Sequence, residues 1–127
     1  MSEIPKVYVC EICGNVVELL IDQDGTLICC GLEMVQQKEN TVDAAKEKHI
    51  PVVRVEGQKM TVQVGSTLHP MSADHYIAWI EVMEGGKLKR AVFKPGDEPK
   101  AEFCTAGKAY TVRAYCNLHG LWKESDS

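Results

Sequence analysis

Residues 76–93 read YIAWIEVMEGGKLKRAVF, and this stretch indicates the fold more directly than any other. The run from Tyr76 to Met83 is apolar apart from Tyr76 and Glu81, and we predict that it forms a strand. A second run, from Leu88 to Phe93, follows across Glu84-Gly85-Gly86-Lys87, and a Gly-Gly pair between two such runs is typical of a β-hairpin. The stretch therefore predicts two antiparallel strands joined by a tight turn.

Similar short runs surround this hairpin from Pro51 onward. They cover Val52–Val55, Lys59–Val64, Ala101–Cys104 and Ala109–Cys116, with turn residues at Glu56-Gly57-Gln58, Pro95-Gly96-Asp97 and Ala106-Gly107. Six or seven short strands with a turn every 8 to 12 residues, in about 75 residues, are typical of an antiparallel β-sandwich of immunoglobulin-like type. We therefore predict a mainly β protein in which residues 38–127 form this sandwich.

Residues 1–37 predict a separate small module. They contain the apolar runs Lys6–Val9 and Val16–Ile21, and a turn at Asp22-Gln23-Asp24-Gly25. So few residues cannot bury enough apolar surface to fold alone, and below about 40 residues a metal or an oligomeric partner is usually needed. We place the domain boundary near residue 38 and expect a short helix after it, capped by Asn40 and ended before Pro51.

Composition narrows the class of protein. The 127-residue chain has a formal net charge of −4 and 45% hydrophobic residues, as soluble globular proteins do, and it lacks the basic surface of a nucleic-acid-binding protein. No signal-peptide core follows Met1 to Lys6, and no apolar run is long enough to span a membrane. We therefore expect a cytoplasmic protein, whose six cysteines are better interpreted as metal ligands than as disulfides.

The first ligand set is Cys10-x-x-Cys13 followed by the adjacent pair Cys29-Cys30. Four thiolates suit zinc or a single iron, and the spacing by itself favours neither. We expect the Cys-x-x-Cys turn to aim backbone N–H groups at its sulfurs. The adjacent pair can bind one ion only where the backbone turns sharply, because neighbouring side chains in extended chain point to opposite faces. A thioredoxin-like redox pair is disfavoured, since no βαβ pattern surrounds it.

The second ligand set is His49, His69 and His75, completed by Cys116-x-x-His119. Five ligands exceed the four of tetrahedral zinc and suit an iron that leaves one position open. A sulfur opposite that opening donates electron density to the iron, which suits one-electron oxygen chemistry.

Two other classes of protein compete with this interpretation. A Cys-x-x-His near the end of a β-sandwich is similar to the ligand loop of a blue-copper protein, which would make the chain a non-catalytic electron-transfer protein. Against copper, Gly120-Leu121-Trp122 supplies no following methionine, and four histidines are too many. A zinc-stabilised binding protein is the third possibility, and metal analysis with a visible spectrum would separate all three.

The chain resembles the desulfoferrodoxins, the superoxide reductases with two iron sites, over essentially its whole length. The motifs that carry the resemblance are Cys10-Glu11-Ile12-Cys13, Cys29-Cys30, Glu47-Lys48-His49-Ile50-Pro51, His69-Pro70-Met71 and Tyr115-Cys116-Asn117-Leu118-His119-Gly120. The resemblance implies two non-haem irons per chain. It assigns one iron to the four cysteines of the first set, and the other to His49, His69, His75 and His119 with Cys116 axial. It also implies one-electron reduction of superoxide to hydrogen peroxide, re-reduction by an external donor such as rubredoxin, and a homodimer.

We also predict the roles of three residues that are not ligands in these motifs. Lys48 is expected to attract the anionic substrate and to help order a water that delivers protons. Glu47 matches the family residue that can occupy the sixth position of the oxidised iron. Cys104 is expected to be a small apolar strand residue outside both ligand sets.

Position 114 departs from the family pattern. Desulfoferrodoxins typically carry a glutamate two residues before the axial cysteine, where this chain has Ala114. Residues two apart in a strand share a face, so position 114 should project on the same side as Cys116. We expect the iron site to assemble with alanine. The missing carboxylate should change electron donation from the sulfur, and with it the lifetime of the bound product.

Overall fold

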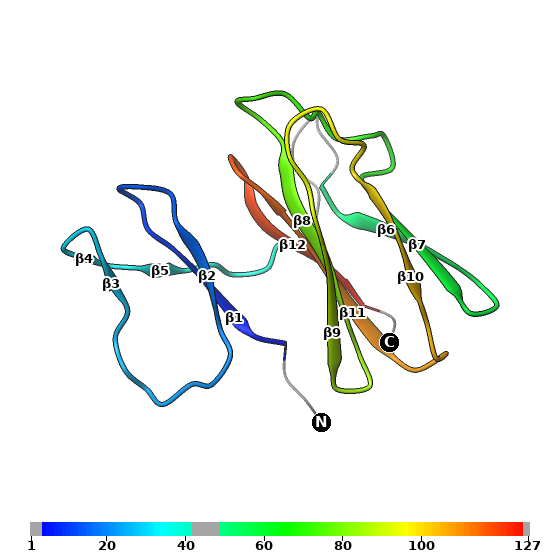
Figure 1. Cartoon of the computed structure of the whole chain (residues 1–127), viewed down its shortest axis with the longest axis horizontal. Helices are drawn as coiled ribbons and strands as arrows, with labels where there is room; N and C mark the ends of the chain where they lie inside the picture. The colour runs from blue at the N-terminus through cyan, green and yellow to red at the C-terminus, as the bar shows by residue number, and fades with distance from the viewer. Residues whose placement is uncertain (1–3, 42–48, 126–127) are drawn as a thin grey trace. The chain divides into compact units, whose positions relative to one another are not determined.

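The computed structural model describes residues 4–41 and 49–125, and its described elements are all β-strands. Contacts between Cα atoms divide the chain into two compact units between Lys38 and Glu39. Each unit is drawn in Figure 1 with its strands labelled. No described helix is long and apolar enough to cross a membrane.

The larger unit is an antiparallel sandwich of two sheets (Figure 1), as predicted. The three-stranded sheet has the order β10-β7-β6 and consists of β6 (Pro51–Glu56), β7 (Lys59–Val64) and β10 (Lys100–Cys104). The four-stranded sheet has the order β12-β11-β8-β9 and consists of β8 (Ile77–Glu84), β9 (Lys87–Val92), β11 (Tyr110–Cys116) and β12 (Gly120–Ser125).

The core lies between these sheets and follows the alternation of the strands. Its buried members are Met60, Val62 and Val64 of β7, Ile77, Ile80 and Val82 of β8, and Val112, Ala114 and Cys116 of β11. Glu81 of β8 and Arg113 of β11, which lie between core residues in sequence, face the other side of this sheet. Ala114 and Cys116 thus share the inner face, as expected, and position 114 is fully buried.

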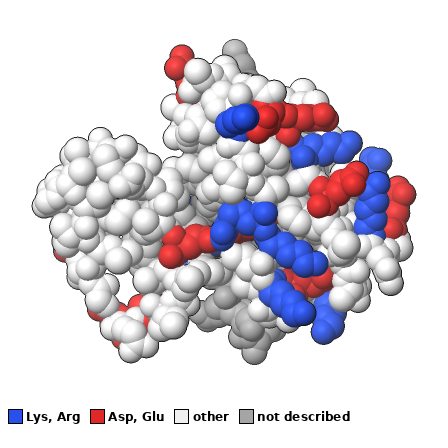
Figure 2. Space-filling model, viewed as in Figure 1, with Lys and Arg blue, Asp and Glu red and all other residues white. Residues whose placement is uncertain are grey.

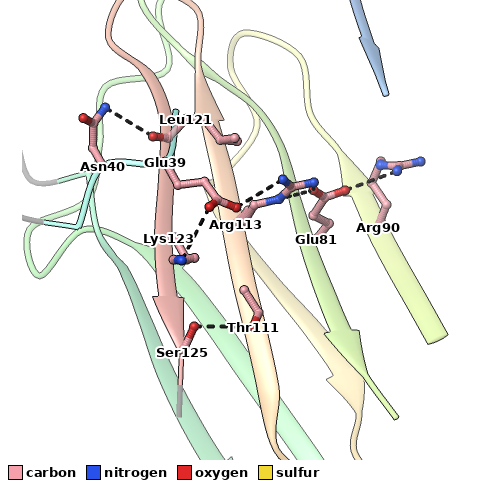
Figure 3. A network of polar contacts seen from close by, with 9 residues as sticks. All are labelled: Glu39, Asn40, Glu81, Arg90, Thr111, Arg113, Leu121, Lys123 and Ser125. Atoms are coloured by element: carbon pink, nitrogen blue, oxygen red, sulfur yellow. Dashed lines mark hydrogen bonds and ion pairs between the residues drawn. The ribbon is translucent and has the colours of Figure 1, made fainter. Parts of the chain in front are cut away.

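An ion-pair network crosses the outer face of the four-stranded sheet (Figure 3). The Arg113 guanidinium is 2% exposed, donates from Nε to Glu81 Oε1 at 2.7 Å, and contacts the same oxygen through Nη2. Its Nη1 donates to Glu39 Oε2 at 3.2 Å. Arg90 Nη2 lies 3.2 Å from the second Glu81 oxygen, and Lys123 Nζ lies 3.4 Å from Glu39. The wholly buried Glu81 carboxylate is therefore compensated by two arginines.

Asn40 pairs with the edge strand β12. Its backbone N–H donates to the Leu121 carbonyl at 2.9 Å, and its own carbonyl accepts from the Lys123 N–H at 2.9 Å. These two bonds form a parallel bridge between Asn40 and Trp122. The helix expected after Asn40 falls on residues 42–48, which lie outside the described residues.

The smaller unit has a three-stranded sheet in the order β2-β1-β5 and a two-stranded hairpin, β3-β4. Its strands are β1 (Lys6–Val9), β2 (Val16–Leu19), β3 (Ile28–Cys29), β4 (Leu32–Glu33) and β5 (Val35–Gln36). Many of its large apolar side chains are exposed, including Ile12, Leu20, Ile21, Ile28 and Leu32. Figure 2 shows few charged side chains on the visible face of this unit, whereas acidic and basic groups are interleaved over the larger one.

Candidate metal centres

Four cysteines of the smaller unit gather their sulfurs in one place. Cys10, Cys13, Cys29 and Cys30 each offer a sulfur within 4.8 Å of the others. The Cys13 and Cys29 sulfurs are 3.7 Å apart. This matches the edge of about 3.8 Å of a tetrahedron whose metal–sulfur bonds are about 2.3 Å long. The arrangement therefore fits a tetrahedral four-sulfur site.

The Cys10–Cys13 turn directs backbone donors at the sulfurs, which confirms the expectation from sequence. The Cys13 N–H donates to the Cys10 sulfur, and the Asn15 N–H donates to the Cys13 sulfur, both at 3.4 Å. Gly14 permits the turn through its φ of 83°, and its N–H donates to the Cys10 carbonyl at 2.9 Å. Such donors stabilise thiolates over thiols.

The adjacent cysteines meet at the sharp turn that their shared site requires. Cys29 ends β3, and Cys30 with Gly31 links β3 to β4. Both linking residues have positive φ, 53° for Cys30 and 78° for Gly31, as a type I′ hairpin turn demands. Cys30 is one of two non-glycine residues with positive φ in the described chain. The sharp reversal brings two sequence neighbours to one side.

Neighbouring groups shift the pKa values of Cys10 and Cys30 in opposite directions. The Cys13 N–H lowers the pKa of Cys10 to about 6, whereas the neighbouring sulfurs of Cys13 and Cys10 raise the pKa of Cys30 to about 12. One thiolate therefore opposes ionisation of the next. A bound cation is what lets four thiols lose their protons together, so the donor set fits a metal ion.

The second set lies at one end of the sandwich, the upper end of the larger unit in Figure 1. His49 precedes β6, His69 and His75 lie in the connection from β7 to β8, and Cys116 and His119 flank the turn from β11 to β12. Strand pairing explains the convergence, because Pro51 lies opposite Val64, and Cys116 lies opposite both Ile77 and Gly120. A register shift between Tyr115 and Cys116 adjusts the position of the cysteine, as irregularities beside functional sites often do.

The four imidazoles form a closed ring in the order His49, His69, His75, His119. Successive ring centroids are 4.7, 4.5, 5.0 and 4.9 Å apart, and every successive pair meets edge to face. The diagonal between His49 and His75 is longer, 6.3 Å. Four sides of similar length and a longer diagonal describe a square of imidazoles around one central point.

The ligand atoms face that central point. His119 Nδ1 lies 3.1 Å from His49 Nε2 and 3.8 Å from Cys116 Sγ. Two nitrogens at right angles around a metal, with bonds of about 2.1 Å, would be about 3.0 Å apart. His49, His75, Cys116 and His119 have ligand atoms within 4.8 Å of one another. His69 is not part of this tightest group, but its ring completes the square.

Hydrogen bonds orient the His69 ring and restrict the backbone at His75. His69 Nδ1 lies 2.8 Å from the Pro70 carbonyl, which can only accept, so Nδ1 carries the proton and Nε2 is left to bind a metal. Ser72 and His75 exchange backbone hydrogen bonds of 2.9 and 3.3 Å, and the Ser72 hydroxyl also donates to the His75 carbonyl. These bonds restrict the loop that presents His75.

Asn117 links that loop to the cysteine turn, a role that sequence analysis missed although Asn117 stands within the quoted motif. Its side chain accepts from the Tyr76 N–H at 2.8 Å and donates to the Asp74 carbonyl at 3.0 Å. Asn117, which directly follows Cys116, is thus hydrogen-bonded to the residues on both sides of His75.

The histidine–cysteine set fits a metal ion with one accessible side. Cys116, His49 and His69 are buried, whereas His119 is exposed and His75 is half-buried. His75 Nε2 is buried and has no hydrogen-bond partner among the described residues, as expected of a nitrogen that requires a cation. Five soft or borderline donors of this kind suit iron better than tetrahedral zinc.

Three predicted residues lie outside these two sets. Glu47 and Lys48 belong to residues 42–48, outside the described part of the chain. Cys104 ends β10 and is exposed, opposite Lys59 at the far end of β7 from His69. A rise of about 3.3 Å per residue from Lys59 to Val64 puts it roughly 17 Å from the histidine end of that strand.

Comparison with known proteins gives matches along nearly the whole chain. Two family models match, "Desulfoferrodoxin" over residues 41–125 and "Desulfoferrodoxin, N-terminal domain" over residues 2–36. A desulfoferrodoxin homolog of Archaeoglobus fulgidus is 50% identical over 123 residues, which cover 97% of this chain and 98% of that one. The desulfoferrodoxin of Syntrophotalea carbinolica is 51% identical over 122 residues, with 96% and 97% covered.

The fold also matches a solved structure. The crystal structure of the superoxide reductase from Treponema pallidum superposes with a TM-score of 0.80 at 27% sequence identity. The superposition covers 97% of this chain and 99% of that one. The likeness therefore extends over both units.

Proposed function

The chain belongs to the desulfoferrodoxin family, and on that premise we propose how its two ligand sets and their neighbours serve superoxide reduction. The protein is a superoxide reductase: superoxide takes up one electron and two protons and leaves as hydrogen peroxide. The observation that carries this function is the square of four imidazoles beside a buried cysteine sulfur, with one accessible side.

We assign His49, His69, His75, His119 and Cys116 as ligands of the catalytic iron, and Cys10, Cys13, Cys29 and Cys30 as ligands of the second iron. The histidine–cysteine set would hold a ferrous iron able to supply the electron, and the Cys116 thiolate would donate electron density to that iron. The chain itself arranges the imidazoles in a ring, keeps the sulfur away from water, and leaves the side at His119 and His75 less buried than the rest of the set. Lys48 and Glu47 are proposed to serve at this side, because they directly precede His49.

A stoichiometric assay tests this function. With a reductant present, the iron-loaded protein should form one hydrogen peroxide for each superoxide consumed and release no oxygen. Dismutation would instead form one peroxide for every two superoxides and release oxygen. A non-catalytic electron-transfer protein would exchange electrons with a donor without accelerating superoxide loss, and that result would refute the proposal.

Replacing Cys13 with serine should remove the sulfur-bound iron and leave the histidine–cysteine iron in place. Four thiolates leave no open coordination position, so superoxide reduction should survive this loss. Metal analysis and the visible spectrum would follow both irons, with Cys104→Ser as the matched control, since Cys104 lies in neither set. Loss of both irons, or stoichiometric zinc in both sites of protein grown with ample iron, would contradict the assignment.

Replacing Lys48 with isoleucine should slow the second-order reaction with superoxide by about tenfold at low salt and flatten its ionic-strength dependence. A cation beside the site attracts an anion that the net charge of −4 repels. The iron spectrum should not change. Lys87→Ile is the control, because this exposed lysine begins β9 at the end of the sandwich opposite the histidines. Equal rates for the two variants at low salt would make Lys48 an ordinary surface residue.

We further propose a rubredoxin-like electron donor, a homodimer and a cytoplasmic location. The exposed apolar side chains of the smaller unit support self-association, because a soluble chain rarely leaves so many uncovered. Six cysteines, most of them in ligand sets, suit a reducing compartment. Light scattering of the iron-loaded protein would give the oligomeric state, and reduction kinetics with purified rubredoxin would test the donor.

A further inference from the structure

Trp122 contacts the histidine–cysteine set without belonging to it. Its indole ring lies nearly parallel to the His49 imidazole, with ring centroids 4.5 Å apart and an angle of 14° between the planes. Both residues are buried, with 7% of Trp122 and 1% of His49 exposed. The other rings around His49 meet it at 37° to 80°, so Trp122 is the described neighbour that lies flat against it.

We infer that Trp122 is a positioning residue for the metal centre, because its ring fixes the plane of the His49 imidazole. An imidazole bound through one nitrogen can rotate about its bond to the metal, and a flat aromatic surface at stacking distance opposes that rotation. The inference rests on the proposal that this set binds metal. It does not depend on which reaction the metal performs.

The backbone around Trp122 gives this support a fixed base. Trp122 lies in β12, which pairs along its length with β11, the strand that ends at Cys116. On the other edge of β12, the Asn40 bridge engages Leu121 and Lys123, the two neighbours of Trp122. The backbone at Trp122 is therefore held between two partners, and its position relative to Cys116 is set by strand pairing.

Ala114 lies directly opposite Trp122 in the register of β11 and β12, and the two side chains share the inner face of the sheet. Ala114 is fully buried. Strand register therefore places Trp122 opposite a small core residue of the strand that ends at Cys116.

The indole N–H does not explain why tryptophan stands here. Nε1 of Trp122 is buried and has no hydrogen-bond partner among the residues that the structure describes. What Trp122 offers His49 is its aromatic face. Phenylalanine should therefore replace it in function, whereas an aliphatic side chain of comparable bulk should not.

The test compares Trp122→Phe with Trp122→Leu in the iron-loaded protein. Release of the histidine-bound iron to a ferrous chelator should stay within about twofold of the parent for Phe and become about tenfold faster for Leu, since loss of a ligand's supporting partner typically costs 10–100-fold in metal affinity. The sulfur-to-iron charge-transfer band should shift for Leu alone. Release that is unchanged in Trp122→Leu, or equally fast in both variants, would overturn the inference.

A second measurement leaves Trp122 itself intact and so avoids any folding defect of its variants. In Trp79→Phe, Trp122 is the one remaining tryptophan, because the chain has two. Titration of the iron-free protein with Co²⁺ should quench this emission in step with the cobalt–thiolate absorption of the histidine–cysteine set. Emission that stays constant while that set fills would show that the ring does not contact the loaded centre. Neither readout uses superoxide, so failure of the proposed reaction would leave both results interpretable.

Discussion

Replacing Arg113 with leucine is expected to lower the free energy of unfolding by about 3–5 kcal/mol, the cost of removing one partner of a buried ion pair. Glu81 is wholly buried, and Arg113 contacts it through two nitrogens. After the replacement, the described ion-pair partner of Glu81 is Arg90. The Arg90 side chain is 35% exposed, so water screens its charge. A buried carboxylate with so little compensation destabilises the folded state.

The loss should depend on pH. Burial raises the pKa of Glu81 above its usual value, and the charge of Arg113 opposes that rise. Without Arg113 the folded-state pKa should rise further. A carboxyl group whose pKa is raised in the folded state destabilises that state at pH values above the raised pKa. As the pH falls through the folded-state pKa toward the unfolded-state pKa, the carboxyl group becomes protonated and the destabilisation is lost. The destabilisation should therefore be largest near pH 8 and smaller near pH 5.5.

Urea unfolding of parent and variant at each pH measures this difference. Lys59→Leu is the matched control, because Lys59 and Glu102 form an ion pair of 3.2 Å with side chains 58% and 61% exposed. Its cost should stay below about 1 kcal/mol. The double variant Arg113→Leu, Glu81→Leu should recover most of the loss, because no buried charge is left uncompensated. A cost below about 1 kcal/mol for Arg113→Leu would show that water reaches Glu81.

Replacing Cys116 with serine is expected to abolish the sulfur-to-iron charge-transfer band and most superoxide reductase activity. Loss of a residue that merely supports a metal ligand typically lowers metal affinity or activity by roughly 10–100-fold. Cys116 is itself a proposed ligand, so its replacement should lower the activity by more than this. The Cys116 sulfur is fully buried among His49, His75 and His119. A serine hydroxyl is a harder and far less acidic donor than a thiol, so it cannot supply the same electron density to iron.

Cys104 provides the control for this prediction. It lies at the far end of the β10–β7 pair and outside both ligand sets, so Cys104→Ser should keep the band and the activity. Resonance Raman or visible spectroscopy of the ferric protein would compare the two variants. A charge-transfer band that persists in Cys116→Ser would require sulfur from elsewhere, and the distance of Cys104 excludes it as a local substitute.

Local sequence pattern predicted most strands of the sandwich. Alternation and flanking turns placed Lys59–Val64 with the bounds of β7, and Tyr76–Met83 and Leu88–Phe93 lie within one residue of β8 and β9. These strands were accessible from sequence because apolar or alternating runs are bounded by clear turn residues. β12 was missed, since its apolar part is only Leu121-Trp122 between a glycine and charged residues.

The ligand types were equally accessible, because few residues can bind a soft metal and this chain concentrates them in two spacings. The sharp turn at Cys29-Cys30 also followed from sequence, since extended backbone would separate the two sulfurs. The roles of Glu47 and Lys48 stay predictions. The family resemblance contributed what spacing left open, namely iron rather than zinc in the four-cysteine set.

The amino-acid sequence by itself thus determined the mainly β class, the two ligand sets and the chemistry that they favour. Tertiary structure alone decided the cyclic order of the imidazoles, the pairing of Glu81 with Arg113, the bridging position of Asn117 and the stacking of Trp122 on His49. The physical reason is that these contacts depend on strand register between segments far apart in the chain. A shift of one residue would turn Arg113 into the core and Ala114 out of it, and no local pattern fixes which partner residue stands opposite.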